Sequence, residues 1–91
     1  MSLAISPLLV GGASIRAATR TSRMAWNAAK RGDMRLAVSR GITAAVIAAR
    51  VSCKARDKRT LRRADDVIQG VRGLIQGILM KRAAANLRKM A

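Results

Sequence analysis

Histidine, glutamate, phenylalanine and tyrosine are absent from this sequence, and cysteine, proline and tryptophan occur once each. Aspartate is therefore the only side chain that could act as a general base at neutral pH, and no serine has a partner that would activate it as a nucleophile. One cysteine without histidine excludes the usual zinc sites. No phosphate-binding glycine loop of the P-loop or dinucleotide type is present. The sequence predicts a protein that is not an enzyme and holds no metal or cofactor.

The scarcity of aromatic side chains also limits how nucleic acid could be bound. Modules that read single strands stack bases on aromatic platforms, and Trp26 alone cannot supply one. We expect Trp26 to anchor a packing or interface contact instead. Any nucleic-acid binding should therefore be electrostatic, through phosphate contacts that do not read sequence.

Large apolar side chains are few as well, because eighteen of the 91 residues are alanine. A chain of this length makes one small domain and buries only roughly 60% of its unfolded surface. We therefore expect help from copies of itself or from other proteins of a larger assembly.

What the chain has in abundance is positive charge. Nineteen Lys and Arg residues face four Asp residues, which gives a net charge of +15 spread along the whole chain. Such a charge favours a polyanionic partner, either nucleic acid or an anionic membrane surface.

The N-terminal segment is apolar but does not form a convincing signal peptide or membrane span. "SLAISPLLVGGASI" (residues 2–15) lacks a positive start, and it falls short of the roughly 20 apolar residues that a span needs. We interpret residues 1–12 as an extended arm because Pro7 and the Gly11–Gly12 pair oppose a helix. The first 31 residues contain no acid, so an organellar transit peptide is an alternative.

The remainder, residues 13–91, is predicted to be a single all-α domain with helices at about 14–31, 34–54 and 60–88. Ser14, Asp33 and Thr60 are the expected N-caps, and Gly32 is the expected stop. The dense charges of residues 54–60 mark the second turn. A single long, bent helix through that turn is an alternative, because no Gly or Pro lies between residues 42 and 69. Nothing alternates at period two over a useful length, so no strand is predicted.

Three groups of cations are candidate nucleic-acid-binding residues. At about 100° per residue, the cations of the first helix share one arc about 100° wide. This first group contains Arg16, Arg20, Arg23, Lys30 and Arg31. The densest group, around the second turn, contains Lys54, Arg56, Lys58, Arg59, Arg62 and Arg63. A C-terminal group contains Lys81, Arg82, Arg88 and Lys89.

The second helix is apolar nearly all round between residues 42 and 51. Ile42 and Val46 lie on one side, and Ile47 and Val51 lie on the other. A helix of this kind is normally surrounded by neighbours, some of which could belong to other subunits. The flanking charges and the short apolar run favour a buried helix over a membrane span. Cys53 is expected to be a small buried residue, with an intermolecular disulfide as the alternative.

The third helix contains three glycines within the repeat "IQGVRGLIQGI" (residues 68–78). Each interior glycine costs about 1 kcal/mol relative to alanine. The apolar face, which includes Ile68, Val71, Ile75 and Ile78, lies opposite a strip made of Gly70, Gly73 and Gly77. We interpret both faces as helix-packing surfaces, the strip for close approach of a second partner. A hinge or kink at the glycines is the alternative.

These features favour a non-enzymatic structural subunit, a small basic virion or nucleocapsid protein of the virion interior or capsid shell. It would form homo-oligomers and bind nucleic acid non-specifically, DNA more readily than RNA. One alternative is a membrane-associated amphipathic protein, either a viral membrane protein or a pore-forming factor. Another is an accessory subunit of an organellar complex.

Overall fold

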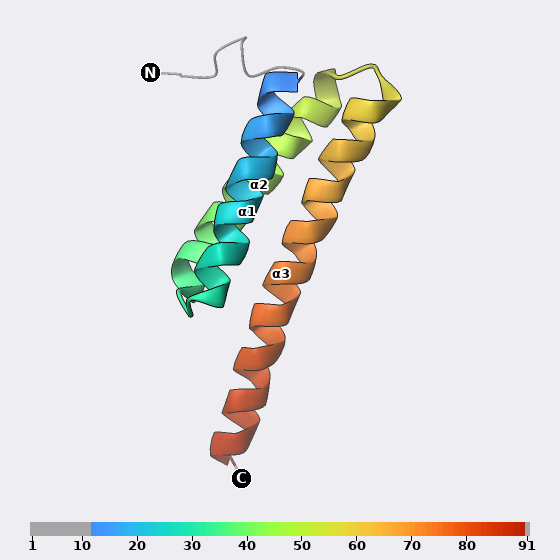
Figure 1. Cartoon of the computed structure of the whole chain (residues 1–91). Coiled ribbons are helices and arrows are strands. Elements are labelled where there is room, and N and C mark those ends of the chain that lie inside the picture. Colours follow the sequence, from blue (N-terminus) through green and yellow to red (C-terminus); the bar gives the residue numbers. More distant parts are fainter. Residues whose placement is uncertain (1–11, 91) are drawn as a thin grey trace, which may run out of the picture.

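The chain folds into three helices, each antiparallel to the one before it (Figure 1), and the computed structural model describes residues 12–90. They are α1 (Gly12–Lys30), α2 (Met34–Lys54) and α3 (Lys58–Met90). No strand occurs in this range. The all-α prediction is confirmed, and the three helices lie within two residues of the expected bounds. The alternative of one long bent helix is wrong. The predicted N-terminal arm lies almost entirely outside the described residues.

The first turn forms as its sequence indicates. Gly32 ends α1 with a φ of +85°, a left-handed conformation that glycine adopts without steric cost. Asp33 then caps α2, since its Oδ1 accepts a hydrogen bond of 3.1 Å from the backbone N–H of Leu36. The prediction for Asp33 is therefore confirmed.

The second turn is capped by a different residue from the one expected. Ala55 leaves α2 in an extended conformation (ψ 143°), and Asp57 precedes α3. The Asp57 carboxylate accepts hydrogen bonds from the backbone N–H of Thr60 at 2.9 Å and from its hydroxyl at 2.8 Å. Thr60 is thus a donor inside α3, because an ionised aspartate accepts more strongly than a hydroxyl. Ser14 likewise lies inside α1, which begins at Gly12.

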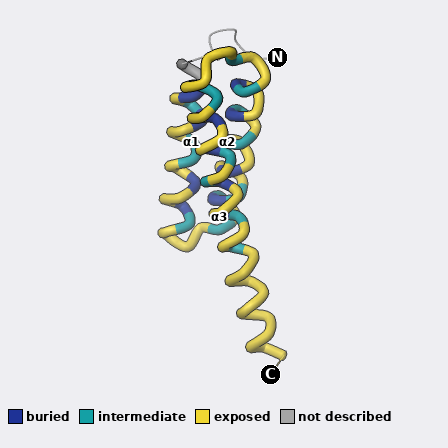
Figure 2. Tube along the Cα trace, turned by 90° about the vertical axis from the view of Figure 1, so that its right-hand side faces the viewer, coloured by how far each residue is buried: buried dark blue, intermediate teal, exposed yellow. Residues whose placement is uncertain are grey.

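The core is built mainly from alanine. Seven of the twelve buried apolar residues are alanines, and Val51 is the largest side chain with full burial. The alanines come from all three helices, and Figure 2 shows the buried positions on their inner sides. Small side chains let the helix axes approach closely, but each contributes little apolar area. The core is therefore as poor in large side chains as the composition implies.

Gly41 lies where the three helices meet. A Cβ at this position would lie 3.2 Å from Val71 Cγ1 of α3 and 4.0 Å from Ala25 Cβ of α1. The close approach of α3 to α2 therefore depends on the missing side chain. Sequence reasoning did not single out Gly41, because a lone glycine in an apolar helix gives no indication of which neighbour it faces.

α3 is much longer than its two partners. With 33 residues and a rise of about 1.5 Å per residue it is about 50 Å long, close to the longest molecular extent of 52 Å. Ala64, Val67, Val71 and Leu74 are buried against the other helices, as the predicted apolar face requires. Residues 79–90 are all exposed and project beyond the α1–α2 turn (Figures 1 and 2).

α2 is less enclosed than expected. Its buried residues form one row, from Ala37 to Val51, whereas Ile42 and Val46 are 52% and 45% exposed. Cys53 is exposed too, because it lies about 200° around the helix from Val51. α2 is long and apolar enough to cross a membrane, with a mean hydropathy of 1.4. Helices in the cores of soluble proteins meet the same criterion, so the preference for a buried helix over a membrane span stays a prediction.

Candidate nucleic-acid interface

Two of the predicted basic groups meet at a groove between α1 and α3. Its volume is about 580 Å³, and its floor includes Ile15 and Val67, which are 2% and 8% exposed. Around this floor stand four arginines, two hydroxyl residues and one acid. They are Arg16, Thr19, Arg20, Ser22 and Arg23 of α1, with Arg63 and Asp66 of α3. We call this feature the arginine groove.

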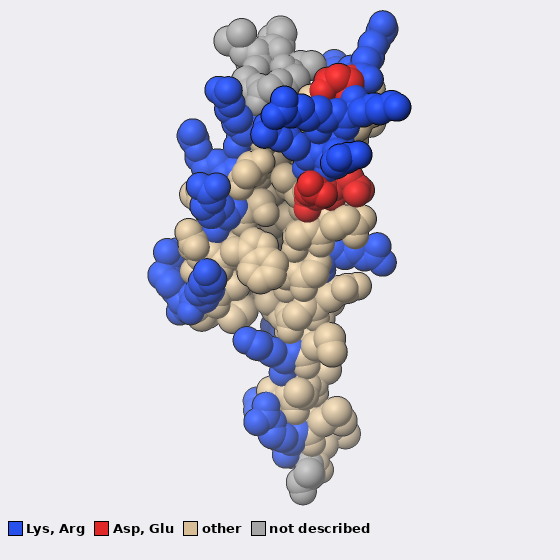
Figure 3. All heavy atoms as spheres, turned by 45° about the vertical axis from the view of Figure 1, so that its right-hand side comes forward, with Lys and Arg blue, Asp and Glu red and all other residues tan. Residues whose placement is uncertain are grey.

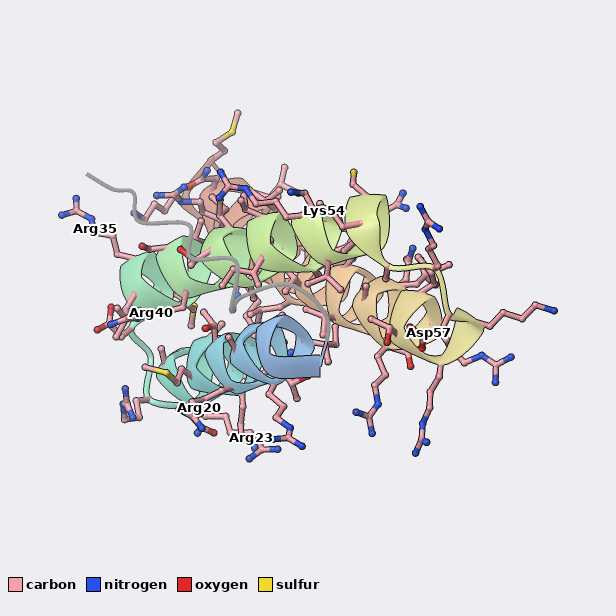
Figure 4. The ribbon with its side chains drawn as sticks, turned by 90° about the horizontal axis from the view of Figure 1, so that it is seen from above. Arg20, Arg23, Arg35, Arg40, Lys54 and Asp57 are labelled. Carbon is pink, nitrogen blue, oxygen red and sulfur yellow. The ribbon has the colours of Figure 1, made fainter. Side chains whose placement is uncertain are left out.

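The spacing of α1 explains how the arginine groove forms. Arg16, Arg20 and Arg23 follow one another at intervals of four and three residues, so they lie along one side of the helix. All three are exposed, and Figure 4 shows Arg20 and Arg23 extending from the outer side of α1. The Thr19 hydroxyl donates to the Ile15 carbonyl at 2.8 Å. Three of the five cations of the predicted basic stripe therefore line this groove, and α3 adds Arg63 beside them.

The cations around the second turn form the densest charge on the molecule. Lys54, Arg56, Lys58, Arg59, Arg62 and Arg63 are all exposed. Figure 3 shows a cluster of Lys and Arg side chains at the end of the bundle where the α2–α3 turn lies. Hydrogen bonds from the Thr60 N–H and hydroxyl, in that order of importance, hold the pKa of Asp57 below its ordinary value. Asp57 therefore stays ionised and structural, and it offsets one of these six positive charges.

The remaining predicted cations lie elsewhere. Lys30 and Lys81 line a second groove of about 310 Å³ between the end of α1 and α3, together with Trp26, Gly73 and Gly77. Arg31 is exposed in the first turn, and Arg82, Arg88 and Lys89 lie on the projecting part of α3. The five cations predicted to share one arc are thus divided between the arginine groove and the region around the first turn.

A third groove contains a cation that sequence reasoning missed. Arg35 of α2 lines a space of about 890 Å³ with Lys81 and Arg82 of α3, over an apolar lining that includes Ile42 and Ile78. Figure 4 shows Arg35 and Arg40 at the end of α2 opposite Lys54. Helical spacing within α2 could not reveal Arg35, because its basic neighbours belong to a helix more than 40 residues further along the chain.

The glycine strip of α3 is open. In the described part of the chain, no atom outside the helix's own backbone lies within 4 Å of a Cβ placed on Gly70, Gly73 or Gly77. α3 runs unbroken through all three glycines. On the predicted apolar face, Val71 is buried while Ile68, Ile75 and Ile78 are half-buried. Within residues 12–90 the strip packs closely against neither α1 nor α2, and its pairing with a second partner stays a prediction.

Trp26 lies beside this strip and is 42% exposed. Its indole lines the second groove and lies outside the buried core. Among the residues with described side chains, no three His, Cys, Asp or Glu residues come together as a metal site would require.

Fold and surface together define a small, strongly basic three-helix protein whose cations gather at a groove and at two helix ends. No family model, curated protein or solved structure matches the chain.

Proposed function

We propose that this protein is a non-enzymatic structural subunit that contacts nucleic acid through phosphate groups without reading base sequence. The observation that supports this most directly is the arginine groove. Four guanidinium groups share it with a single carboxylate, so its local charge is strongly positive. Guanidinium groups bind phosphate oxygens in a bidentate manner, and the Ser22 hydroxyl adds a further donor for the same ligand.

The distribution of charge supports a packaging role over a regulatory one. Basic groups cover the arginine groove, the α2–α3 turn and the projecting end of α3, so one chain can touch several phosphate segments at once. A small basic virion or nucleocapsid protein, in the virion interior or the capsid shell, needs this kind of contact. We propose DNA as the more favoured nucleic acid, with RNA as the second.

Removing three arginines from the groove tests this proposal. The variant Arg16→Gln, Arg20→Gln, Arg23→Gln should lose affinity for duplex DNA. The slope of log K against log salt should become shallower by about 2.7, at about 0.9 per lost phosphate contact. Fluorescence anisotropy with two duplexes of unrelated sequence and one RNA, across a salt series, measures both quantities.

The matched control removes three arginines that line none of the three grooves. Arg40→Gln, Arg50→Gln, Arg72→Gln lowers the net charge equally, and all three side chains are exposed. We expect a clearly smaller loss of affinity and slope. Equal losses in the two triple variants would mean that binding follows net charge and that the arginine groove is not the interface. A tenfold preference between the two duplexes would contradict sequence-independent binding.

A membrane-associated role is the second candidate, favoured by the length and apolar composition of α2. Under that proposal Ile42 and Val46, which are exposed on the bundle, would contact lipid. Binding to phosphatidylglycerol vesicles that persists in 1 M salt, combined with weak DNA binding, would support this role. Binding to vesicles that disappears with salt would count against apolar insertion.

A further inference from the structure

The apolar side chains of α3 change sides near Leu79. Up to Ile78 they point toward α1 and α2, where Val71 and Leu74 are buried. Beyond that point Leu79, Met80, Leu87 and Met90 are between 55% and 83% exposed. At about 100° per residue, the mean direction of these four lies about 150° around the helix from the buried face. The projecting segment, residues 79–90, therefore presents an apolar face that turns away from its own bundle.

The cations of the projecting segment lie on the other side. Lys81, Arg82, Arg88 and Lys89 share an arc about 120° wide, and its centre is about 170° from the apolar face. Figure 3 shows this division, with blue side chains along one side of the lower end and tan side chains along the other. The apolar face thus contains no charge of its own.

The spacing along this face is that of a helix–helix seam. Met80, Ala83, Leu87 and Met90 follow one another at intervals of three, four and three residues. This is the a/d spacing that keeps one line of side chains toward a partner helix. An ordinary solvated helix end has no need for three large apolar side chains in that register.

We propose that the projecting segment pairs with the same segment of a second copy of this chain, in antiparallel orientation. The seam is symmetrical about its middle, so antiparallel pairing places Met80 against the partner's Met90 and Ala83 against the partner's Leu87. A large side chain then meets a small one, which fits close packing. The cations of both copies remain on the outer sides of the pair.

Parallel pairing is disfavoured by charges further up α3. Arg62 and Arg72 lie on the side of α3 that continues the apolar face upward, at about −100° and 180° when Lys81 is set at 0°. Two parallel helices would bring these arginines against their counterparts along a longer shared length. Antiparallel pairing instead ends the contact near Leu79 and holds the two basic bundles at opposite ends.

The net charge makes this pairing conditional. Two chains of +15 repel each other, and the repulsion is screened either by salt or by a bound polyanion. Pairing that depends on a bound polyanion rests on the proposed function, since nucleic acid held on the outer basic faces would screen the repulsion between the two chains. Pairing in concentrated salt needs no nucleic acid, so the two proposals can fail separately.

Sedimentation velocity of the full chain tests the pairing. At 1 M NaCl, where the Debye length is about 3 Å, we expect dimers that dissociate as the salt concentration falls. Met80→Gln with Leu87→Gln should weaken dimerisation by at least a hundredfold, since the two copies together lose four buried side chains. The matched control Ala85→Gln lies on the basic face of the same segment and should leave the dimer intact. Circular dichroism verifies that the variants keep their helices.

Disulfide trapping determines the orientation. In a Cys53→Ser background, Met80→Cys together with Met90→Cys should cross-link two chains readily, whereas either substitution alone should cross-link weakly because equal positions lie about 15 Å apart along the axis. Efficient cross-linking by Met80→Cys alone would overturn the antiparallel arrangement. A monomeric wild-type chain both in 1 M NaCl and with saturating DNA would overturn pairing altogether. If that monomer bound phosphatidylglycerol vesicles and the Leu87→Gln variant did not, the apolar face would be a lipid-binding surface instead.

Discussion

Filling the glycine strip of α3 should stabilise the isolated protein. Gly73 and Gly77 are exposed, and a Cβ on either meets no atom within 4 Å outside the helix's own backbone. Gly73→Ala and Gly77→Ala therefore remove the helix-propensity penalty of glycine, about 1 kcal/mol each, without creating a clash. For a chain of this size, the combined gain of about 2 kcal/mol corresponds to a rise in Tm of about 8–16 °C.

Thermal unfolding followed by circular dichroism in 0.5 M NaCl measures this gain while screening the self-repulsion of the chain. Gly41→Ala is the matched control, because its new Cβ would lie 3.2 Å from Val71 Cγ1 and the crowding offsets the propensity gain. We expect a clearly smaller rise in Tm at Gly41. An unchanged or lower Tm for the Gly73 and Gly77 variants would refute the open strip and imply that it is covered in solution. If the strip is an assembly surface, the same variants should be more stable alone but assemble less well.

Three further predictions concern the turns and the cysteine. Asp57→Ala should lower stability at neutral pH. In the wild type, the stabilisation by Asp57 should be present above about pH 4 and be lost as the pH falls through its lowered pKa. Urea titrations of the wild type and Asp57→Asn at several pH values measure this, and a constant difference between these two proteins down to pH 2 would contradict it. Asp33→Ala should cost about 1 kcal/mol by removing the N-cap of α2, and an unchanged urea midpoint would show that this hydrogen bond contributes nothing. Cys53 should react with a thiol reagent in the native state as fast as in denaturant because it is exposed, whereas slow reaction relieved by denaturant would place it in an interface.

The sequence predicts those features that depend on contacts within one turn of helix, such as where a helix begins and ends. The positions of α1, α2 and α3 follow from Gly32, Asp33 and the charged segment near residue 57, and α3 buries much of the apolar face that its spacing indicates. α2 differs, because its apolar residues surround the helix and its spacing does not show which side is buried. Local competition accounts for the error at Thr60, because Asp57 lies three residues earlier and is the stronger acceptor. The exposure of Cys53 could not be predicted, because both sides of α2 are apolar and only the structure shows that the Val51 side is buried.

Contacts between helices were beyond sequence reasoning. Nothing in α1 alone indicates that Arg63 would join Arg16, Arg20 and Arg23, because their meeting depends on how α3 is rotated and shifted against α1. The same limit applies to the glycines. Gly41 is the one that α3 approaches closely, whereas the three conspicuous glycines of α3 face open space.

The alanine core has a consequence for how related chains would be recognised. Ala25, Ala44 and Ala48 are 0% exposed, so larger residues there would push the helices apart. Exposed arginines that bind phosphate without reading sequence can change position, provided that the total charge and its broad placement persist. Divergence should therefore erase the identity of most surface residues and leave a spaced pattern of small ones. We expect a relative to retain the spacing of the buried alanines and Gly41 more often than any individual Lys or Arg.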